Sequence, residues 1–524
     1  MKKKYWKRLR QTSQLACLFV FLMLFRLTEY SGSDKIDLAV NLWFRLDPLV
    51  GVCVTLATRT LIVLLWPCVL VLGLTMVFGR WFCGWVCPLG TLTDIAARVI
   101  RPKYSPMAFS AWRHLKYGIL IFLVLSSVFS VQFLGFFDPF ALLVRAMAFS
   151  LDPVFNFLAT SGFNQIYLSG PAWLSQLTEP VFDLFKAYLL PHKQSFYYLS
   201  LVSFCLLAGI LGLEFLGRRF WCRTICPLGA LLGLAASTSI LKRMPPKTCK
   251  GCGLCNTLCP MGSFDKENQF LGQECHLCTN CLAYCPQQIT RFRLGPARPV
   301  DLSRRKILGA AVMGVTVPVM TRLGAGPGKS DLIRPPGVLD ERDFLAVCVR
   351  CGECMKVCIT QGLQPLGLDT GLDAMFTPVL VPRIGHCEFN CTLCSSVCPT
   401  QAIKGLSRPE KQAHVMGKAF FDKNRCLPWV DGQDCLVCEE HCPTHNKAIQ
   451  FKAVQIAARS GQTRKLKQPY VIADRCIGCG ICEHVCPVPG EAAIRVRGRN
   501  TSGGRRAIQG SESDGGYPPG PSLY

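Results

Sequence analysis

Hydrophobic residues gather into four long runs within the first 220 positions of this chain. The runs cover residues 15–27, 61–78, 115–137 and 196–216. The second carries no charged residue and is close to the minimum of about 17 residues that a transmembrane helix needs. We therefore expect four membrane-spanning helices, with an interfacial or re-entrant helix over 47–59. No A-x-A cleavage site follows the basic N-terminal stretch, so we expect the first run to be a retained span.

Charged residues between the runs predict the orientation. Residues 80–116 hold six basic residues and one acidic residue. Residues 136–195 hold three basic and four acidic residues, and residues 217–306 hold fourteen basic and four acidic residues. Because cytoplasmic loops carry the excess of lysine and arginine, the N-terminus and the first and third of these segments are expected in the cytoplasm. Segment 136–195 is then expected on the outer side.

Composition agrees with a membrane protein. Only 17% of the 524 residues are charged and 50% are hydrophobic, whereas a soluble domain has roughly 25% charged residues. The net charge of +25 is largely explained by the cytoplasmic loops, and no nucleic-acid-binding motif accompanies it. We therefore expect membrane lipid, and no nucleic acid, among the partners. The sequence also lacks a C-x-x-C-H haem motif and a glycine-rich nucleotide fingerprint.

A weak internal repeat carries two Cys-x3-Cys-Pro motifs. The segment FRLDP precedes GRWFCGWVCPLG, and FFDP precedes RRFWCRTICPLG. Cys83 and Cys87 are expected to share a helix face at i,i+4, with Pro88 starting the next helix, and the same holds for Cys222 and Cys226. These four thiols could hold an additional metal centre or cycle between thiol and disulfide. The alternative is a plain turn between two helices.

Twenty-four of the 32 cysteines form six groups of four after residue 240. The regular groups read C-x2-C-x2-C-x3-C-P, in which three thiolates hold one [4Fe–4S] cluster and the fourth ligates the neighbouring cluster. Zinc is the alternative, but zinc sites normally pair two short C-x2-4-C hooks. Six clusters would contain about 24 irons, and closely packed clusters form an electron wire.

The predicted ligand sets follow from this exchange within three pairs of groups. They are Cys249, Cys252, Cys255 with Cys285; Cys275, Cys278, Cys281 with Cys259; Cys348, Cys351, Cys354 with Cys398; Cys387, Cys391, Cys394 with Cys358; Cys426, Cys435, Cys438 with Cys486; and Cys476, Cys479, Cys482 with Cys442. The other cysteines, Cys17, Cys53, Cys68 and Cys205, resemble ordinary apolar membrane residues.

Two acidic residues stand at equivalent positions of the repeat, Asp47-Pro48 and Asp138-Pro139. Ionisable groups at membrane depth are costly, so these carboxylates are candidates to accept protons in a quinol site. The alternative is that each aspartate caps a helix whose first residue is proline. Both functions are compatible.

These motifs resemble a known pair of electron-transfer components. The segments FRLDPL, GRWFCGWVCPLG and RRFWCRTICPLG, followed by a two-cluster ferredoxin, resemble the membrane quinol dehydrogenase component of periplasmic nitrate reductase systems (NapH type). The segments SRRKILGAA, FLAVCVRCGECMKVC and LQPLGLDTGLDAMFTP resemble the partner four-cluster ferredoxin (NapG or MauM type). The resemblance implies a fusion of the two, in which the twin-arginine segment becomes internal.

The expected fold is an α-helical membrane domain with four spans and a fifth, joined to α+β ferredoxin-like 2[4Fe–4S] modules. Residues 1–240 would form the membrane domain, 241–300 a cytoplasmic ferredoxin, 301–325 the twin-arginine segment with a fifth span, 326–497 a periplasmic four-cluster ferredoxin, and 498–524 a disordered tail. The apolar run of the fifth span, 307–320, is short for a span but typical of a signal sequence. Twin-arginine signals export folded domains.

The expected function is a quinol dehydrogenase of the bacterial inner membrane, taking electrons from the quinone pool to a periplasmic terminal reductase or its cytochrome. One alternative is a polyferredoxin subunit of a complex in which another chain binds quinol. The other is a membrane-bound redox sensor or maturation factor. The direction of electron flow follows from the resemblance and not from the cysteine pattern.

Overall fold

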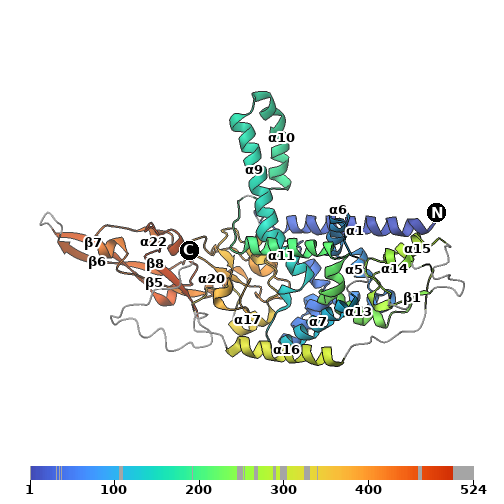
Figure 1. The fold of residues 1–524 in the computed structure, drawn as a ribbon. Coiled ribbons are helices and arrows are strands. Elements are labelled where there is room, and N and C mark those ends of the chain that lie inside the picture. The colour runs from blue at the N-terminus through green and yellow to red at the C-terminus, as the bar shows by residue number, and fades with distance from the viewer. Residues whose placement is uncertain are drawn as a thin grey trace.

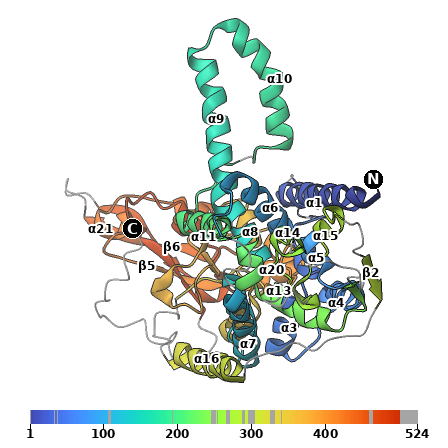
Figure 2. The same ribbon diagram turned by 45° about the vertical axis from the view of Figure 1, so that its right-hand side comes forward.

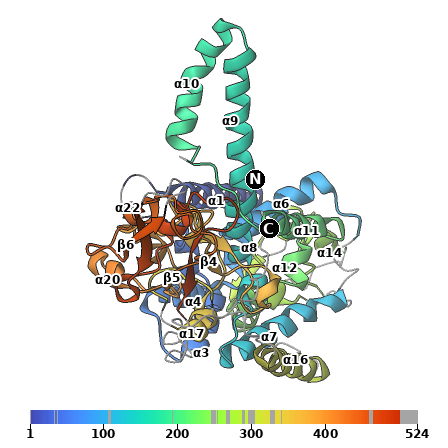
Figure 3. The ribbon, with the colours of Figure 1, turned by 90° about the vertical axis from the view of Figure 1, so that its left-hand side faces the viewer.

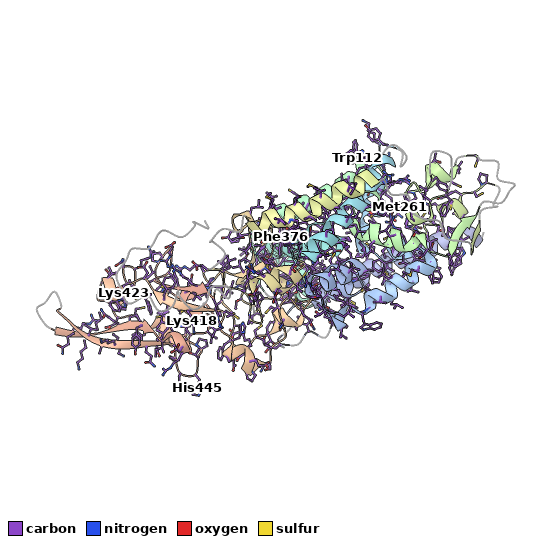
Figure 4. The ribbon with its side chains drawn as sticks, turned by 90° about the horizontal axis from the view of Figure 1, so that it is seen from below. Trp112, Met261, Phe376, Lys418, Lys423 and His445 are labelled. Atoms are coloured by element: carbon purple, nitrogen blue, oxygen red, sulfur yellow. The ribbon has the colours of Figure 1, made fainter. Side chains whose placement is uncertain are left out.

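The computed structural model describes residues 2–30, 32, 34, 36, 38–104, 110–191, 193–244, 252, 254–264, 270–286, 291–294, 304–323, 331–338, 340–457 and 463–499. These residues form an elongated body (Figure 1). Seen from below, Met261 lies toward one end, Phe376 near the middle, and Lys418, Lys423 and His445 toward the other end (Figure 4). Of the tail 498–524 predicted to be disordered, residues 500–524 lie outside the described residues. The prediction is wrong at its start, because Gly498 ends a β-strand and Arg499 donates its backbone N–H to the carbonyl of Met416.

The first 240 residues are helical. Their helices are α1 (Lys2–Leu27), α2 (Leu42–Arg45), α3 (Pro48–Thr58), α4 (Pro67–Phe78), α5 (Trp81–Trp85), α6 (Pro88–Ile100), α7 (Leu115–Val128), α8 (Pro139–Ala146), α9 (Asp152–Ser169), α10 (Ala172–Tyr188), α11 (Ser200–Gly212), α12 (Phe220–Thr224) and α13 (Pro227–Ser237). Proline opens five of them because its fixed φ suits the first helical position, where the missing N–H costs no hydrogen bond. We call this part the membrane half.

Helices α4, α7 and α11 are shorter than the hydrophobic runs in which they lie, whereas α1 extends beyond its run. The third run, 115–137, is helical over α7 and the 3-10 turn Leu134–Phe136, and the fourth over α11 and the 3-10 turn Leu213–Phe215. Among the described residues, one helix is long and apolar enough to cross a membrane, the continuous segment Pro139–Ser169. It is none of the four predicted spans and lies in the segment expected on the outer side. The arrangement of four spans therefore stays a prediction that this helix does not support.

Helices α9 and α10 form a hairpin that projects from the body (Figures 1 and 2). It lies in segment 136–195, which the sequence analysis expects on the outer side. Phe163 stacks on Phe182 with ring centroids 4.6 Å apart, and this aromatic seam joins the two helices. A π-helical stretch, Met147–Leu151, connects α9 to α8. The segment that the charge counts treat as a connection between two spans therefore contains a pair of ordered helices.

A first module follows the membrane half. Strand β1 (Leu241–Met244) pairs antiparallel with β2 (Arg291–Leu294), so that Leu241 faces Leu294. Between them lie α14 (Leu254–Leu258), the 3-10 turn Gly272–Glu274 and α15 (Asn280–Ala283). We call this part module one.

A second module contains three two-stranded antiparallel sheets, β3 with β4, β5 with β8, and β6 with β7. Its strands are β3 (Leu363–Pro365), β4 (Pro378–Leu380), β5 (Gly417–Phe421), β6 (Ile449–Ala457), β7 (Thr463–Val471) and β8 (Ile494–Gly498). Its helices are α17 (Glu341–Val347), α18 (Glu353–Lys356), α19 (Leu393–Ser396), α20 (Arg408–Ala413), α21 (Leu427–Val430), α22 (Val437–Glu440) and α23 (Ile481–His484). We call residues 331–499 module two.

The two modules contact opposite ends of the membrane half. Near the start of α1, Lys7 donates a hydrogen bond to Tyr284 of module one over 2.6 Å. Just beyond its end, Lys356 of module two donates to the carbonyl of Thr28 over 2.9 Å. Helix α16 (Arg304–Leu323), which precedes module two in the chain, lies beside α7, and Gly314 approaches Leu125 closely (Figures 1 and 3).

Two glycines permit the close approach of the modules. A Cβ on Gly84 would lie 2.1 Å from the carbonyl oxygen of His276 in module one, and one on Gly135 would lie 2.3 Å from that of Val349 in module two. We expect Gly84→Ala to loosen module one alone and Gly135→Ala to loosen module two alone, each by about 1–3 kcal/mol. Hydrogen exchange of each module measures this. Gly209→Ala is the control, since nothing lies within 4 Å of its Cβ. Equal effects of both variants on both modules would contradict the prediction.

Candidate redox sites

Four cavities are each lined by four cysteines, three from one group and the fourth from its partner group. The sets are Cys275, Cys278, Cys281 with Cys259; Cys348, Cys351, Cys354 with Cys398; Cys387, Cys391, Cys394 with Cys358; and Cys426, Cys435, Cys438 with Cys486. In each cavity, the fourth thiol comes from the group that the exchange pattern pairs with the first three. Ligation by these sets stays a prediction.

The two remaining sets are placed in part. The thiol of Cys479 has those of Cys476 and Cys442 as electrostatic neighbours, and Cys482 lies beside Cys476 and Cys479. In the first set, Cys252, Cys255 and Cys285 are described, whereas Cys249 lies outside the described residues. The structure therefore does not show whether this set converges.

Local backbone geometry explains how each tight loop presents three thiols. The third cysteine of every group lies in a helix of one turn, such as Cys354 in α18, Cys438 in α22 and Cys482 in α23. The residue before α18, Gly352, has φ +87, and the residue before α23, Gly480, has φ +81. Glycine adopts this left-handed conformation without steric cost, so the chain can turn sharply between consecutive cysteines.

The donor sets fit a [4Fe–4S] cluster better than a zinc ion. Among the residues that the structure describes, no three cysteine, histidine or acidic side chains converge on a position that one metal ion could take. A zinc ion would draw four thiolates to about 2.3 Å from one point, whereas each thiolate of a cubane ligates a different iron. Burial and the neighbouring thiols of Cys387 and Cys391 raise the pKa of Cys394 well above its ordinary value. Positive charge from iron would offset this cost.

The exchange of the fourth cysteine can be tested by combining substitutions. Cys358→Ala and Cys391→Ala should each remove one cluster, about four irons, and the double variant should lose no more than either single variant, because both remove the same cluster. Cys358→Ala combined with Cys351→Ala should lose about eight irons. Iron and sulfide counts on anaerobically purified protein measure this. If Cys358→Ala combined with Cys391→Ala instead lost about eight irons, and Cys358→Ala combined with Cys351→Ala only about four, Cys358 would ligate the cluster of its own group.

The two Cys-x3-Cys-Pro motifs meet, but not on continuous helices. Helix α5 ends at Trp85, and Cys87 is the N-cap of α6, so the expected shared helix face of Cys83 and Cys87 is wrong. The proline that follows each second cysteine disfavours helical geometry at that cysteine. In the second motif, Cys226 likewise caps α13. The structure supports the turn between two helices and also brings the four thiols together as buried electrostatic neighbours.

Two fully buried arginines cross between these motifs. Arg80 precedes Cys83 by three residues and donates to the carbonyl of Cys222 over 3.4 Å. Arg219 precedes Cys222 by three residues and donates to the carbonyl of Cys83 over 2.9 Å. The sequence analysis missed this reciprocal contact, although the equal spacing of arginine and cysteine in the two repeats was a signal for it.

Acidic partners neutralise both arginines. Arg219 pairs with Asp94 at 2.8 Å, and Arg80 pairs with Glu274 of module one at 3.1 Å. Lys116 also contacts Glu274, at 2.5 Å. Burial alone would raise the pKa of Glu274, but Lys116 and Arg80 hold it below its ordinary value. The four-thiol site is therefore connected to the module-one end of the molecule.

The two candidate carboxylates of the quinol site meet inside the membrane half. Asp47 caps α3 by accepting from the backbone N–H of Leu49 over 2.7 Å, and Asp138 caps α8 by accepting from that of Ala141 over 2.7 Å. The predicted capping function is confirmed. Both carboxyl groups are fully buried and interact with each other. One oxygen of each, Oδ2 of Asp47 and Oδ1 of Asp138, has no hydrogen-bond partner within the described part of the chain.

Family models match three parts of the chain. A model described as a 4Fe-4S binding domain matches residues 59–106 and 198–245, which contain the two Cys-x3-Cys-Pro motifs. A model described as a 4Fe-4S dicluster domain matches residues 433–490 in module two. Iron–sulfur binding is therefore supported by comparison as well as by spacing.

Known proteins resemble the chain in two ways. The methylamine utilization ferredoxin-type protein MauM of Methylorubrum extorquens is 34% identical over 227 residues, 40% of this chain and 98% of MauM. The ferredoxin-type protein NapG of Escherichia coli is 33% identical over 189 residues, 36% of this chain and 79% of NapG. The ferredoxin-type protein NapH of Haemophilus influenzae is 28% identical over 309 residues, 55% of this chain and 88% of NapH. No solved structure matches the chain. These similarities support a fusion of NapH-type and NapG-type sequences.

Proposed function

This chain belongs to the family of ferredoxin-type proteins that includes MauM and NapG, and we propose that it passes electrons from membrane quinol through [4Fe–4S] clusters to a periplasmic reductase or its cytochrome. The position of the fully buried pair Asp47 and Asp138, next to module two, carries this proposal. The membrane location and the quinol substrate follow from the hydrophobic runs and from the resemblance to NapH-type sequences.

The positions of the modules support a transmembrane arrangement. Helix α1 has 26 residues and is therefore about 39 Å long, of which the apolar run 15–27 takes about 20 Å and the basic start of the helix takes most of the rest. A bilayer is about 30 Å thick in its hydrocarbon core and about 40–45 Å with its headgroups. Module one contacts the start of α1 and module two its end, so the two modules would lie on opposite sides of a membrane that α1 crosses. We assign module one to the cytoplasm, as the charge pattern predicts, and module two to the periplasm, as the internal twin-arginine segment predicts.

The carboxylate pair supplies the proton chemistry. Two carboxylates in contact inside a buried site repel each other, so a proton bound by either one relieves the repulsion and the pair is suited to accept protons from a quinol. Oxidation of a quinol to a quinone releases two protons and two electrons. In our proposal, the protons leave one at a time through Asp47 and Asp138 to water on the outer side. The clusters supply one-electron transfer when bound, and the cysteine sets described above would hold them.

Anaerobic reduction by a menaquinol analogue tests the proposal. Protein purified in mild detergent should become reduced within seconds, as followed by cluster absorbance and paramagnetic signals, and a quinol-site inhibitor should abolish the reaction. Loaded clusters that stay oxidised would reject a quinol site on this chain and favour a polyferredoxin subunit, or a sensor, whose electrons come from another protein.

A further inference from the structure

Two buried arginines meet where the membrane half contacts module two. Arg145 lies on α8, and Arg350 lies between Cys348 and Cys351 of module two. Each side chain belongs to a residue that is only 1% exposed. Arg145 donates to the carbonyl of Gly135 over 3.0 Å and to that of Arg350 over 3.2 Å. The contact therefore joins the two parts of the molecule directly.

Neither arginine has an acidic partner within ion-pair distance among the described residues. Nη2 of Arg145 and Nε and Nη1 of Arg350 are buried without a hydrogen-bond partner in this part of the chain. Aromatic rings supply some compensation, with Arg145 4.0 Å from the ring centre of Phe376 and Arg350 4.9 Å from that of Phe136. Two adjacent buried cations still require a negative group nearby.

The arrangement around them indicates which negative group that is. Arg145 has Cys351 and Asp138 as electrostatic neighbours. Arg350 has Cys348 and Asp373 as electrostatic neighbours, and its Nη2 donates to the carbonyl of Asp373 over 2.9 Å. Arg350 also lines the cavity of Cys348, Cys351, Cys354 and Cys398. A cubane held by four thiolates carries net negative charge and gains a further negative charge on reduction. The two guanidinium groups would therefore favour the reduced cluster over the oxidised one.

We propose that the cluster held by Cys348, Cys351, Cys354 and Cys398 is the first to accept electrons from quinol, and that Arg145 and Arg350 are positioning residues that raise its reduction potential. The entry step rests on the proposed function, whereas the effect on the potential does not. Each quinol gives up two electrons and two protons. The protons leave through the carboxylate pair, and the electrons pass singly through this cluster to the other clusters of module two.

Module one is not on this route. Its contacts with the membrane half are at the other end, where Arg80 pairs with Glu274 and Trp85 donates to the carbonyl of Leu277 over 3.2 Å. Asp138, in contrast, is an electrostatic neighbour of Arg145, and so is Cys351 of module two. The interaction of Asp138 with Arg145, and the contact of Arg145 with Arg350, therefore connect the carboxylate pair to a cysteine cavity of module two.

A redox titration of the full-length protein, followed by electron paramagnetic resonance and without quinol, tests the effect of the arginines. In Arg145→Gln and Arg350→Gln, one cluster component should be about tenfold less reduced at a given potential, which is 59 mV for a one-electron couple. Arg145→Lys keeps the charge and should retain most of the wild-type value. Arg26→Gln is the control at the same end, because Arg26 is already paired with Glu29 and Asp152.

Unchanged midpoints in both glutamine variants would overturn the assignment of the arginines. If a glutamine variant fails to assemble, the Arg145→Lys variant gives the test. A midpoint potential in that variant shifted as far as expected for loss of the charge would also overturn the assignment. Freeze-quench after mixing wild-type protein with menaquinol tests the entry step. The component that shifts in Arg145→Gln should be the first to become reduced, and a different first component would reject this cluster as the entry point. A complete lack of reduction would instead reject the proposed quinol function, and the titration result would still stand.

Discussion

Quinol should reduce the clusters of an Asp47→Asn or Asp138→Asn variant about 10²–10⁴-fold more slowly than those of the wild-type protein, the range that a lost general base typically costs. Each carboxyl group uses one oxygen to cap a helix, while its other oxygen has no partner among the described residues. Asparagine caps helices about as well as aspartate but cannot accept the proton of a quinol. The substitution therefore separates proton transfer from helix capping.

The measurement is the rate of cluster reduction by a menaquinol analogue, compared with reduction by dithionite. Dithionite should reduce wild-type and variant clusters equally, because it needs no proton acceptor at the quinol site. Asp340→Asn is the matched control, since Asp340 caps α17 on the surface of module two by accepting from the N–H of Arg342. Unchanged quinol rates in both Asp47→Asn and Asp138→Asn would remove these residues from the mechanism.

The spacing of the cysteines allowed all six sets to be expected from sequence, and four of these sets each line one cavity in the structure. A loop that reads C-x2-C-x2-C can present three thiols only on one side, so the fourth must come from a distant part of the chain. The cavity of Cys387, Cys391, Cys394 and Cys358 shows the same grouping despite the longer first gap in this set. Capping by Asp47 and Asp138 was likewise predictable, because an aspartate followed by proline is a local signal for a helix start.

Contacts between distant segments were not predictable from these local rules. Arg145 and Arg350 are 205 positions apart, and no spacing rule relates a residue of helix α8 to one inside a cysteine loop. Asp47 and Asp138 meet because the starts of α3 and α8 lie close together, which neither motif indicates by itself. The hairpin of α9 and α10 was missed because charge counts assign a side of the membrane but do not report helical periodicity.

The repeat correctly predicted that the two Cys-x3-Cys-Pro motifs meet, but the helix face expected within each motif does not form. Cys83 and Cys87 do not share a helix face, since the proline after Cys87 ends the helical geometry before it. The thiols of both motifs nevertheless gather, because Arg80 and Arg219 hold the carbonyls of the opposite motif. The thiols are therefore brought together by the long, buried side chains of Arg80 and Arg219, and not by the shared helix face that the four-residue spacing suggested.

Replacing Arg304 and Arg305 by lysine should leave module two on the cytoplasmic side of the membrane in nearly all molecules. Twin-arginine signals are read by a receptor that exports folded domains, and clusters must be inserted before export. Helix α16 starts at Arg304 and has 20 residues, about 30 Å, of which the apolar run 307–320 takes about 21 Å, less than the thickness of a bilayer core. Its position beside α7 is compatible with a fifth span that carries module two across the membrane.

Protease protection in spheroplasts and in inverted vesicles measures this effect. In the wild-type protein, protease added to spheroplasts should digest module two and spare module one, whereas inverted vesicles should show the reverse. The double lysine variant should have both modules accessible only in inverted vesicles. Lys306→Arg is the control, because it preserves the charge and the arginine pair. Wild-type module two protected in spheroplasts would refute the transmembrane arrangement. Normal export of the double variant would instead show that module two crosses the membrane by a route that does not need the twin-arginine signal. Electrons from quinol would then still reach the outer side.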